Sequence, residues 1–436
     1  MNKKTYLIKN VSLLGQQQTD ILIEDGLIKE LGQGLIPSAD HSIDAQGLIA
    51  LPGLVDLHTH MREPGFEDAE TIETASQAAA LGGYTAVFAM PNSKPVADTA
   101  GVVEQVHRLG LESGWVQVQP IGAVTVGSQG QGLAEIGAMA NSQAQVKVFS
   151  DDGFCVWDSA LMRRALEYVK AFDGVIAQHA QDPRLTEGAQ MNEGLVSAEL
   201  GLRGWPAVAE ESIIARDILL AEHVGSRLHV CHVSTRGSVA LIRWAKERGI
   251  AVTAEVTPHH LLLTDDLVRS YDPVYKVNPP LRTQADVLAL RQGLAEGVID
   301  IIATDHAPHP LESKDCEWAC AAHGMTGLEQ ALSIAQQTLI DTGLLTWADL
   351  AQVMSERPAK IGGLTKQGRP LAPGEPAHIT LVDPQAKRVI DPQQQATKGK
   401  NNPYRNLELP GAVKAVFYAG KPTVLDGKLA SPSSRS

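Results

Sequence analysis

The chain has 436 residues, and hydrophobic residues make up 44% of them, which is enough material for a large globular core. Its 37 Lys and Arg residues against 50 Asp and Glu residues give a net charge of −13 without any basic run, which argues against nucleic acid or an anionic membrane as the main partner. The four scattered cysteines indicate reduced thiols, and no signal-peptide pattern or long apolar stretch is present, so we expect a cytoplasmic protein.

Both ends of the chain are predicted to be β-rich. Short strand candidates at 6–8, 20–24 and 27–31 are separated by Gly, Gln and Asp turns, and similar segments recur at 379–382 and 413–418. We expect the two ends to pair into one small domain, formed by residues 1–52 and 366–436.

The middle of the chain, residues 53–365, alternates strand and helix candidates. The apolar strand candidates are 53–60, 85–90, 116–123, 145–150, 174–179, 227–234, 251–257 and 298–304. Such continuous, β-branched runs are typical of parallel strands buried on both faces. Eight strand–helix units predict an α/β fold, a (β/α)8 TIM barrel of about 250 residues. A doubly wound open sheet is the alternative, weakened by the lack of a Gly-x-Gly-x-x-Gly turn after the first strand.

Polar side chains occur where five of these strands end. They are His58, His60, the pair Asp151-Asp152, His179, His232 and Asp305. A barrel places its active site at the C-terminal ends of its strands, and imidazole and carboxylate ligands suit Zn2+ or a related ion. One tetrahedral ion does not need four histidines and two aspartates, whereas two ions that share a carboxylate would use all of them. Such a pair can hold a bridging hydroxide and polarise a carbonyl.

The assignment depends on this joint occurrence, because one histidine at a strand end is more often structural. His229 and His232 are three residues apart and face opposite sides of their strand, and we prefer His232 because it is nearer the tip. Spacing alone leaves Asp151 and Asp152 as equal candidates for the bridging ligand. The pair His259-His260 is interpreted as structural.

Several motifs resemble those of bacterial type I dihydroorotases in the amidohydrolase superfamily. The matching segments are 56–65 (DLHTHMREPG), 70–74, 89–92, 149–153 (FSDDG), 229–234 (HVCHVS), 255–260, 278–282 (NPPLR) and 303–309 (ATDHAPH). They follow the family order and cover nearly the whole chain.

The resemblance implies a two-zinc centre. His58, His60 and Asp305 would hold one Zn2+, and His179 and His232 the other. Asp152 would bridge them, in the place where relatives use a carbamylated lysine. Lys147 lies too early for that role and is interpreted as structural.

The reaction that the resemblance implies is the reversible cyclisation of N-carbamoyl-L-aspartate to (S)-dihydroorotate, with a zinc-activated hydroxide and Asp305 as general acid and base. The implied substrate-binding residues are His60, Arg62, Asn92, Asn278, His309, His323 and Gly324. Arg62 would be the bidentate partner of the substrate carboxylate. His323 departs from the family, where a Phe is expected before Gly324, so only its backbone contribution carries over.

Two other functions stay open. One is another cyclic-ureide hydrolase, such as an allantoinase or hydantoinase, although Arg62 and Asn92 favour an acidic substrate. The other is a non-catalytic scaffold for aspartate transcarbamoylase, although scaffolds of that kind have lost ligands that this chain retains. We expect a homo-oligomer, with aspartate transcarbamoylase as a candidate partner. The charged segment 310–323, with Cys316 and Cys320, is expected to be a mobile loop over the site.

Overall fold

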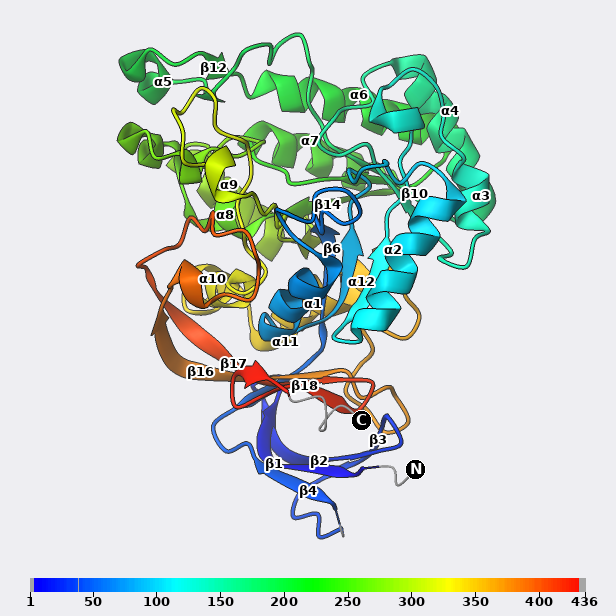
Figure 1. The fold of residues 1–436 in the computed structure, drawn as a ribbon, viewed down its shortest axis with the longest axis vertical. Helices are drawn as coiled ribbons and strands as arrows, with labels where there is room; N and C mark the ends of the chain where they lie inside the picture. Colours follow the sequence, from blue (N-terminus) through cyan, green and yellow to red (C-terminus); the bar gives the residue numbers. More distant parts are fainter. Residues whose placement is uncertain (1–3, 38, 431–436) are drawn as a thin grey trace.

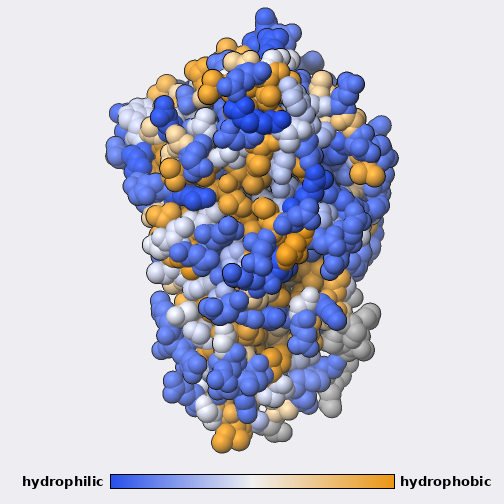
Figure 2. All heavy atoms as spheres, turned by 90° about the vertical axis from the view of Figure 1, so that its left-hand side faces the viewer, coloured by the Kyte–Doolittle hydropathy of each residue, from blue (hydrophilic) through white to orange (hydrophobic). Residues whose placement is uncertain are grey.

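The computed structural model describes residues 4–37 and 39–430. Figure 1 shows two parts, a β-rich layer formed by both ends of the chain and a larger α/β part formed by the middle. Within the described ranges, no helix is both long and apolar enough to cross a membrane. The face drawn in Figure 2 is largely hydrophilic, with a band of apolar side chains running down it.

The terminal layer is a mixed sheet in which the two ends of the chain pair directly. Its strands are β1 (Tyr6–Leu13), β2 (Gln17–Glu24), β3 (Leu27–Gly32), β4 (His41–Asp44), β5 (Ile49–Pro52), β16 (Ile379–Val389), β17 (Glu408–Tyr418), β18 (Lys421–Leu425) and β19 (Lys428–Leu429). The sheet order is β19-β18-β17-β16-β5-β1-β2-β3, with β4 beside β1. Antiparallel pairing of β5 with β16 joins the two ends. Residues 1–3, 38 and 431–436 of the predicted small domain lie outside the described residues.

The strands of the middle part coincide with the eight candidates from the sequence. They are β6 (Leu54–Thr59), β7 (Tyr84–Ala89), β8 (Gln117–Pro120), β9 (Val148–Phe149), β10 (Val175–Gln178), β13 (Leu228–Val230), β14 (Val252–Val256) and β15 (Ile301–Ile302). They form two parallel sheets, β6-β7-β8 and β9-β10-β13-β14-β15. Parallel bridges from Gly122 to Phe149 and from Thr59 to His306 connect the two sheets at both ends.

Helices connect these strands and cover them on the outside (Figure 1). They are α1 (Ile72–Leu81), α2 (Ala100–Ser113), α3 (Ile136–Ala140), α4 (Ser159–Val169), α5 (Leu195–Leu200), α6 (Val208–Val224), α7 (Arg236–Glu247), α8 (Pro258–Leu262), α9 (Gln284–Ala295), α10 (Ala331–Ala335), α11 (Trp347–Ala351) and α12 (Arg357–Ile361). A short parallel pair, β11 (Met191–Asn192) with β12 (Gly204–Trp205), lies in the connection before α6.

The helices begin and pack as their sequences dictate. In α7, Thr235 caps the first turn by accepting from the Ser238 backbone N–H, and Val239, Ile242 and Ala245 are buried at helical spacing. Because β5 ends in the terminal sheet and β6 begins two residues later, β6 starts beside that sheet. Its C-terminal end, with the ends of its parallel neighbours, therefore lies on the far side of the α/β part.

Candidate active site

All six predicted metal ligands converge at the C-terminal ends of the strands. They follow or end β6, β9, β10, β13 and β15, and they are His58, His60, Asp152, His179, His232 and Asp305. Each is at most 5% exposed. They supply two overlapping groups of potential metal ligands that share Asp152.

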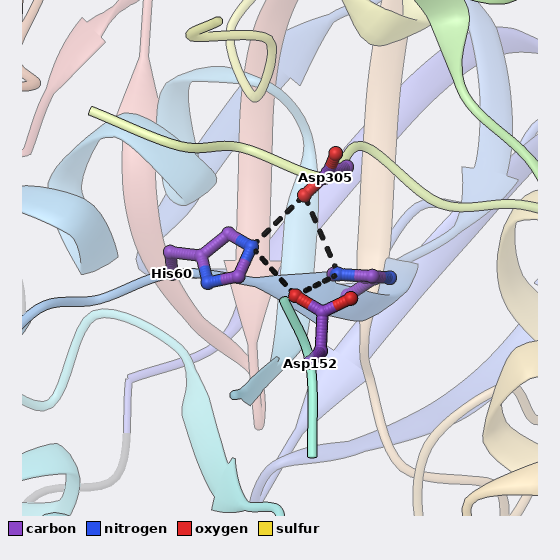
Figure 3. Close-up of side chains that lie close together, drawn as sticks. His60, Asp152 and Asp305 are labelled. Atoms are coloured by element: carbon purple, nitrogen blue, oxygen red, sulfur yellow. Dashed lines mark hydrogen bonds and ion pairs between the residues drawn. The ribbon is translucent and has the colours of Figure 1, made fainter. Parts of the chain in front are cut away.

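The first group surrounds the two carboxylates that Figure 3 shows facing His60. His60 Nε2 lies 2.9 Å from Asp305 Oδ1 and 3.3 Å from Asp152 Oδ2. His58 Nε2 lies 3.3 Å from Asp305 Oδ1 and 3.5 Å from Asp152 Oδ2. Two imidazoles and two carboxylates therefore point their ligand atoms at one common space.

The second group uses the other oxygen of Asp152. His179 Nδ1 and His232 Nε2 each lie 3.1 Å from Asp152 Oδ1, and the two nitrogens are 2.9 Å apart. Asp152 thus presents one oxygen to each group, which is the arrangement of a carboxylate that bridges two ions.

The donor set of the site fits a divalent cation. His58 Nδ1 lies 2.5 Å from Glu255 Oε1, a carboxylate oxygen that only accepts, so Nδ1 carries a proton and Nε2 is the nitrogen left to bind a metal. His58 Nε2 is fully buried and has no hydrogen-bond partner. Burial lowers the pKa of His58, but Asp152, Glu255 and Asp305 together raise it well above its usual value. The nitrogen and oxygen donors fit Zn2+ or a similar divalent ion.

Glu255, in β14, is a functional residue to which the sequence analysis gave no role. Its carboxylate holds His58 Nδ1, lies 3.0 Å from His229 Nε2, and accepts from the His232 backbone N–H at 3.2 Å. Although burial raises the pKa of Glu255, His58 and His229 lower it far below its usual range, so it is ionised. A carboxylate behind a ligand histidine fixes the tautomer that points Nε2 at the metal. In the sequence, the sign of such a role is a single ionisable residue, Glu255, inside an apolar strand that is expected to be buried.

Geometry separates the candidates that spacing left open. Asp151 accepts from the backbone N–H groups of Val124 and Thr125, at 2.8 and 3.0 Å, and so fastens a loop, whereas Asp152 faces the histidines. The Lys147 ammonium donates to Phe172 O at 2.6 Å and belongs to neither ligand group. Among the described residues, Cys316, Cys320 and His259-His260 join no group of potential metal ligands.

A cavity of about 300 Å³ opens over the ligand cluster. It brings together every residue predicted to bind substrate, namely His60, Arg62, Asn92, Asn278, His309, His323 and Gly324. The predicted substrate-binding residues therefore line the same cavity.

Arg62 supplies the positive charge of the cavity. Its Nε donates to Pro308 O at 3.1 Å, and within the described part of the chain no carboxylate lies at ion-pair distance. Burial lowers the pKa of Arg62 to about 10, so the side chain is still protonated at neutral pH. Burial, followed by the charges of Arg62 and Lys314, lowers the pKa of His309 to about 3 and keeps that ring neutral.

Two asparagines have polar atoms without partners among the residues that the structure describes. Asn92 Oδ1 pairs with His60 Nδ1 at 3.0 Å, which leaves the amide hydrogens of Asn92 available to the cavity that it lines. Asn278 Nδ2 donates to Gln181 Oε1 at 3.0 Å, and Asn278 Oδ1 is buried without a partner. The cavity therefore offers donors beside Arg62 and an acceptor beside His179, whose Nε2 lies 3.4 Å from Asn278.

Three of the site residues adopt a left-handed backbone conformation that side chains rarely take. The φ angles are +64° at Arg62, +32° at His232 and +48° at Asp305. Each conformation costs on the order of 1–3 kcal/mol and persists only where surrounding contacts enforce it. At these three positions the surrounding contacts hold the backbone in a conformation that aims the side chain at the site.

Comparison with known proteins identifies close relatives of the chain. The family described as Dihydro-orotase-like matches residues 47–238. The chain is 65% identical over 423 residues to the dihydroorotase of Streptomyces coelicolor, covering 97% of this chain and 99% of that protein. It is 54% identical over 425 residues to the dihydroorotase of Mycobacterium tuberculosis, with 97% and 99% covered.

Solved structures resemble the fold over its whole length. The L-hydantoinase (dihydropyrimidinase) of Arthrobacter aurescens matches with a TM-score of 0.86 at 25% identity, over 98% of this chain and 97% of that chain. A dihydropyrimidinase from Brevibacillus agri matches with a TM-score of 0.85 at 22% identity, over 98% and 96%. The second likeness concerns the fold alone.

Proposed function

Because the chain belongs to the dihydroorotase family, we propose that its cavity performs the reversible cyclisation of N-carbamoyl-L-aspartate to (S)-dihydroorotate in pyrimidine biosynthesis. One observation carries the assignment: Arg62, which has no carboxylate partner among the described residues, lines a cavity of about 300 Å³ together with four of the six potential metal ligands. The ligands suit amide chemistry, and the arginine suits a ring that bears a carboxylate.

The proposed metal centre holds two Zn2+ ions. His58, His60 and Asp305 would bind one ion, His179 and His232 the other, and Asp152 both. Divalent ions held there lower the pKa of water and polarise an amide carbonyl.

The substrate carboxylate is proposed to bind at the opposite end of the cavity. Arg62 provides a planar pair of donors, and Asn92 adds its amide hydrogens. His309 Nε2 already donates to His323 O at 2.7 Å, so its neutral ring orients segment 323–324 rather than donating to the carboxylate. The unpartnered Oδ1 of Asn278 is suited to accept a ring N–H.

Asp305 is the proposed proton carrier. Although burial raises the pKa of Asp305, His58 and His60 lower it to about 2, so the carboxylate is ionised and accepts a proton. In ring closure it would take the ureido proton, and in hydrolysis it would return that proton to the leaving nitrogen.

We also infer that the eight parallel strands close into a (β/α)8 barrel spanning residues 53–365. The support is the pair of bridges that joins both ends of the two parallel sheets, which an open doubly wound sheet would lack. The small domain would comprise residues 1–52 and 366–436. A cytoplasmic location, a homo-oligomeric state and binding to aspartate transcarbamoylase stay predictions, and the apolar band in Figure 2 is the kind of surface that contacts another protein.

The assignment is tested by turnover of dihydroorotate, hydantoin and allantoin, with and without a chelator. We expect dihydroorotate alone to be turned over, and chelation to abolish the reaction. The variant Asp305→Asn should lose at least about 10³-fold in kcat, and because Asp305 is also a proposed ligand, kcat is compared at saturating Zn2+. Turnover of hydantoin or allantoin alone would support the other cyclic-ureide hydrolases, and a wild-type protein without bound divalent metal or turnover would support the scaffold.

A further inference from the structure

Segment 311–323, between Asp305 and Gly324, is folded and fastened to its surroundings. It begins with a 3-10 turn at Leu311–Ser313, and Trp318 is buried in a cluster with Met191, Val196 and Val268. Its end leads into His323 and Gly324, which line the cavity. The segment therefore lies where its position sets one wall of the site, and its predicted mobility stays a prediction.

Two buried lysines fasten this segment to residues 273–278. Lys276 Nζ donates to Trp318 O at 2.7 Å and to Ala319 O at 3.1 Å. In the reverse direction, Lys314 Nζ donates to Pro273 O at 3.0 Å and to Lys276 O at 2.9 Å. Each lysine thus crosses from its own segment to the backbone of the other.

The burial of these two lysines carries a high desolvation cost. Lys276 is 2% exposed and Lys314 is 8% exposed, and in the described ranges no carboxylate lies at ion-pair distance from either ammonium group. Burial, with the neighbouring charge of Lys276, lowers the pKa of Lys314 to about 7. A buried charge is costly unless its hydrogen bonds are satisfied, and here backbone carbonyls of the opposite segment satisfy them.

The backbone carbonyl of Lys276 connects the two lysines to Gly324, which lines the cavity. Lys276 O accepts from Lys314 Nζ and also from the Gly324 backbone N–H, at 3.0 Å. Asn278, with its unpartnered buried oxygen, follows two residues later. The distance between Gly324 and Asn278 across the cavity is thereby coupled to the two ammonium groups.

We propose that Lys276 and Lys314 are positioning residues that hold segment 311–323 against residues 273–278 and so set the wall of the cavity that contacts the substrate ring. The inference rests on the proposed function for the identity of that ring. Removal of either ammonium deletes two hydrogen bonds that cross between the two segments and so frees one side of the attachment. Substrate binding then has to order a loosened segment, which raises KM more than it lowers kcat.

The test is Lys314→Met, which keeps the length of the side chain and removes its donors. We expect KM for dihydroorotate to rise at least tenfold while kcat changes less than threefold. Amide hydrogen exchange in residues 311–323 should become at least tenfold faster. Lys314→Arg retains the charge and the donors, so its KM should stay within threefold of wild type.

The matched control is Lys246→Met in α7. Lys246 Nζ also bonds a carbonyl, Gly297 O at 3.1 Å, and a carboxylate, Asp300 Oδ2 at 2.7 Å, but at the opposite ends of the strands. The variant Lys246→Met should reduce the stability of the protein without changing KM or the rate of amide hydrogen exchange in residues 311–323. An equal rise of KM in this control, or a change in only one of the two readouts for Lys314→Met, overturns the proposal. Exchange needs no turnover, so it decides on the attachment even if dihydroorotate is not the substrate.

Discussion

The two ends of the cavity are built from different kinds of structure. At the metal end, His58, His60, His179 and His232 are at or next to the ends of parallel strands, and Glu255 supports one of them from inside a strand. At the carboxylate end, Arg62, Asn92, His309 and Gly324 lie in connecting segments, outside strands and helices.

Under the proposed function, this difference separates the residues for the chemistry from those that choose the substrate. Strand ends are held by the sheet ladder and its buried faces, so the ligand geometry depends on the whole core. Connecting segments depend on a few local hydrogen bonds, and they can change without disturbing that core. The L-hydantoinase of Arthrobacter aurescens has the same fold at only 25% sequence identity, which is consistent with a constant core and variable connecting segments.

The largest effect is expected at the metal end, from Asp152→Asn. The variant weakens the one side chain that faces both ligand groups, so both ions should bind poorly. Turnover should fall by at least about 10³-fold, beyond the 10–100-fold typical of residues behind the ligands. Metal content, measured by elemental analysis after gel filtration, should fall below half. Full occupancy in the variant would contradict a bridging role and would weaken the contrast between the two ends.

The next effect is expected at the carboxylate end, from Arg62→Met. Loss of the only cation proposed to pair with the substrate carboxylate should cost about 3–4 kcal/mol, or about 10²–10³-fold in kcat/KM. Metal content should not change, because the Arg62 side chain belongs to neither ligand group. Dihydrouracil, the same ring without a carboxylate, serves as the control inhibitor. If dihydrouracil weakens as much as dihydroorotate, Arg62 supports the cavity in general and does not select the acid.

The sequence predicted that these side chains converge, because the C-terminal ends of neighbouring parallel strands lie on the same side. His58, His60, His179, His232 and Asp305 could each be placed by that rule. This rule could not separate Asp151 from Asp152, because the directions of neighbouring side chains in a turn depend on the backbone conformation of that turn. The resemblance chose Asp152, which is the carboxylate that faces the histidines, and its bridging role stays a prediction.

What the sequence could not supply are contacts made by residues far apart in the chain. Glu255 was quoted in a motif, but its role depends on the packing of β14 against the end of β6. Lys276 and Lys314 bond backbone carbonyls, which carry no sequence signal. The fold was easier to predict, because periodic burial is visible in the sequence, and all eight predicted strands are present.

A smaller effect at the metal end is expected from Glu255→Gln. The amide still accepts from His58 Nδ1 but lacks the charge that strengthens this bond, so the affinity for zinc should fall about 10–100-fold. Competition with a coloured chelator measures that affinity without any turnover. Asp20→Asn, which alters a buried carboxylate of the terminal sheet, controls for lost stability. An affinity equal to that of wild type would restrict Glu255 to a structural role.

The smallest effect is expected at the carboxylate end from Asn401→Ala. Asn401 Oδ1 accepts from the His309 backbone N–H at 3.0 Å, and Asn401 Nδ2 donates to Ala307 O at 2.9 Å and to Gly324 O at 3.1 Å. Each bond contributes about 1 kcal/mol, and part of that should appear as an increase of about tenfold in KM.

Asn401 touches neither the substrate nor a metal ligand, so kcat and zinc affinity should stay within about twofold of wild type, well under one hydrogen bond in free energy. Asn402→Ala, next along the chain, removes a bond to Gln330 at 2.9 Å and controls for general loosening of this segment. A fall in zinc affinity in Asn401→Ala would mean that the connecting segments also set the ligand geometry. The two ends of the cavity would then be coupled, and a change in substrate preference would also alter the geometry of the metal ligands.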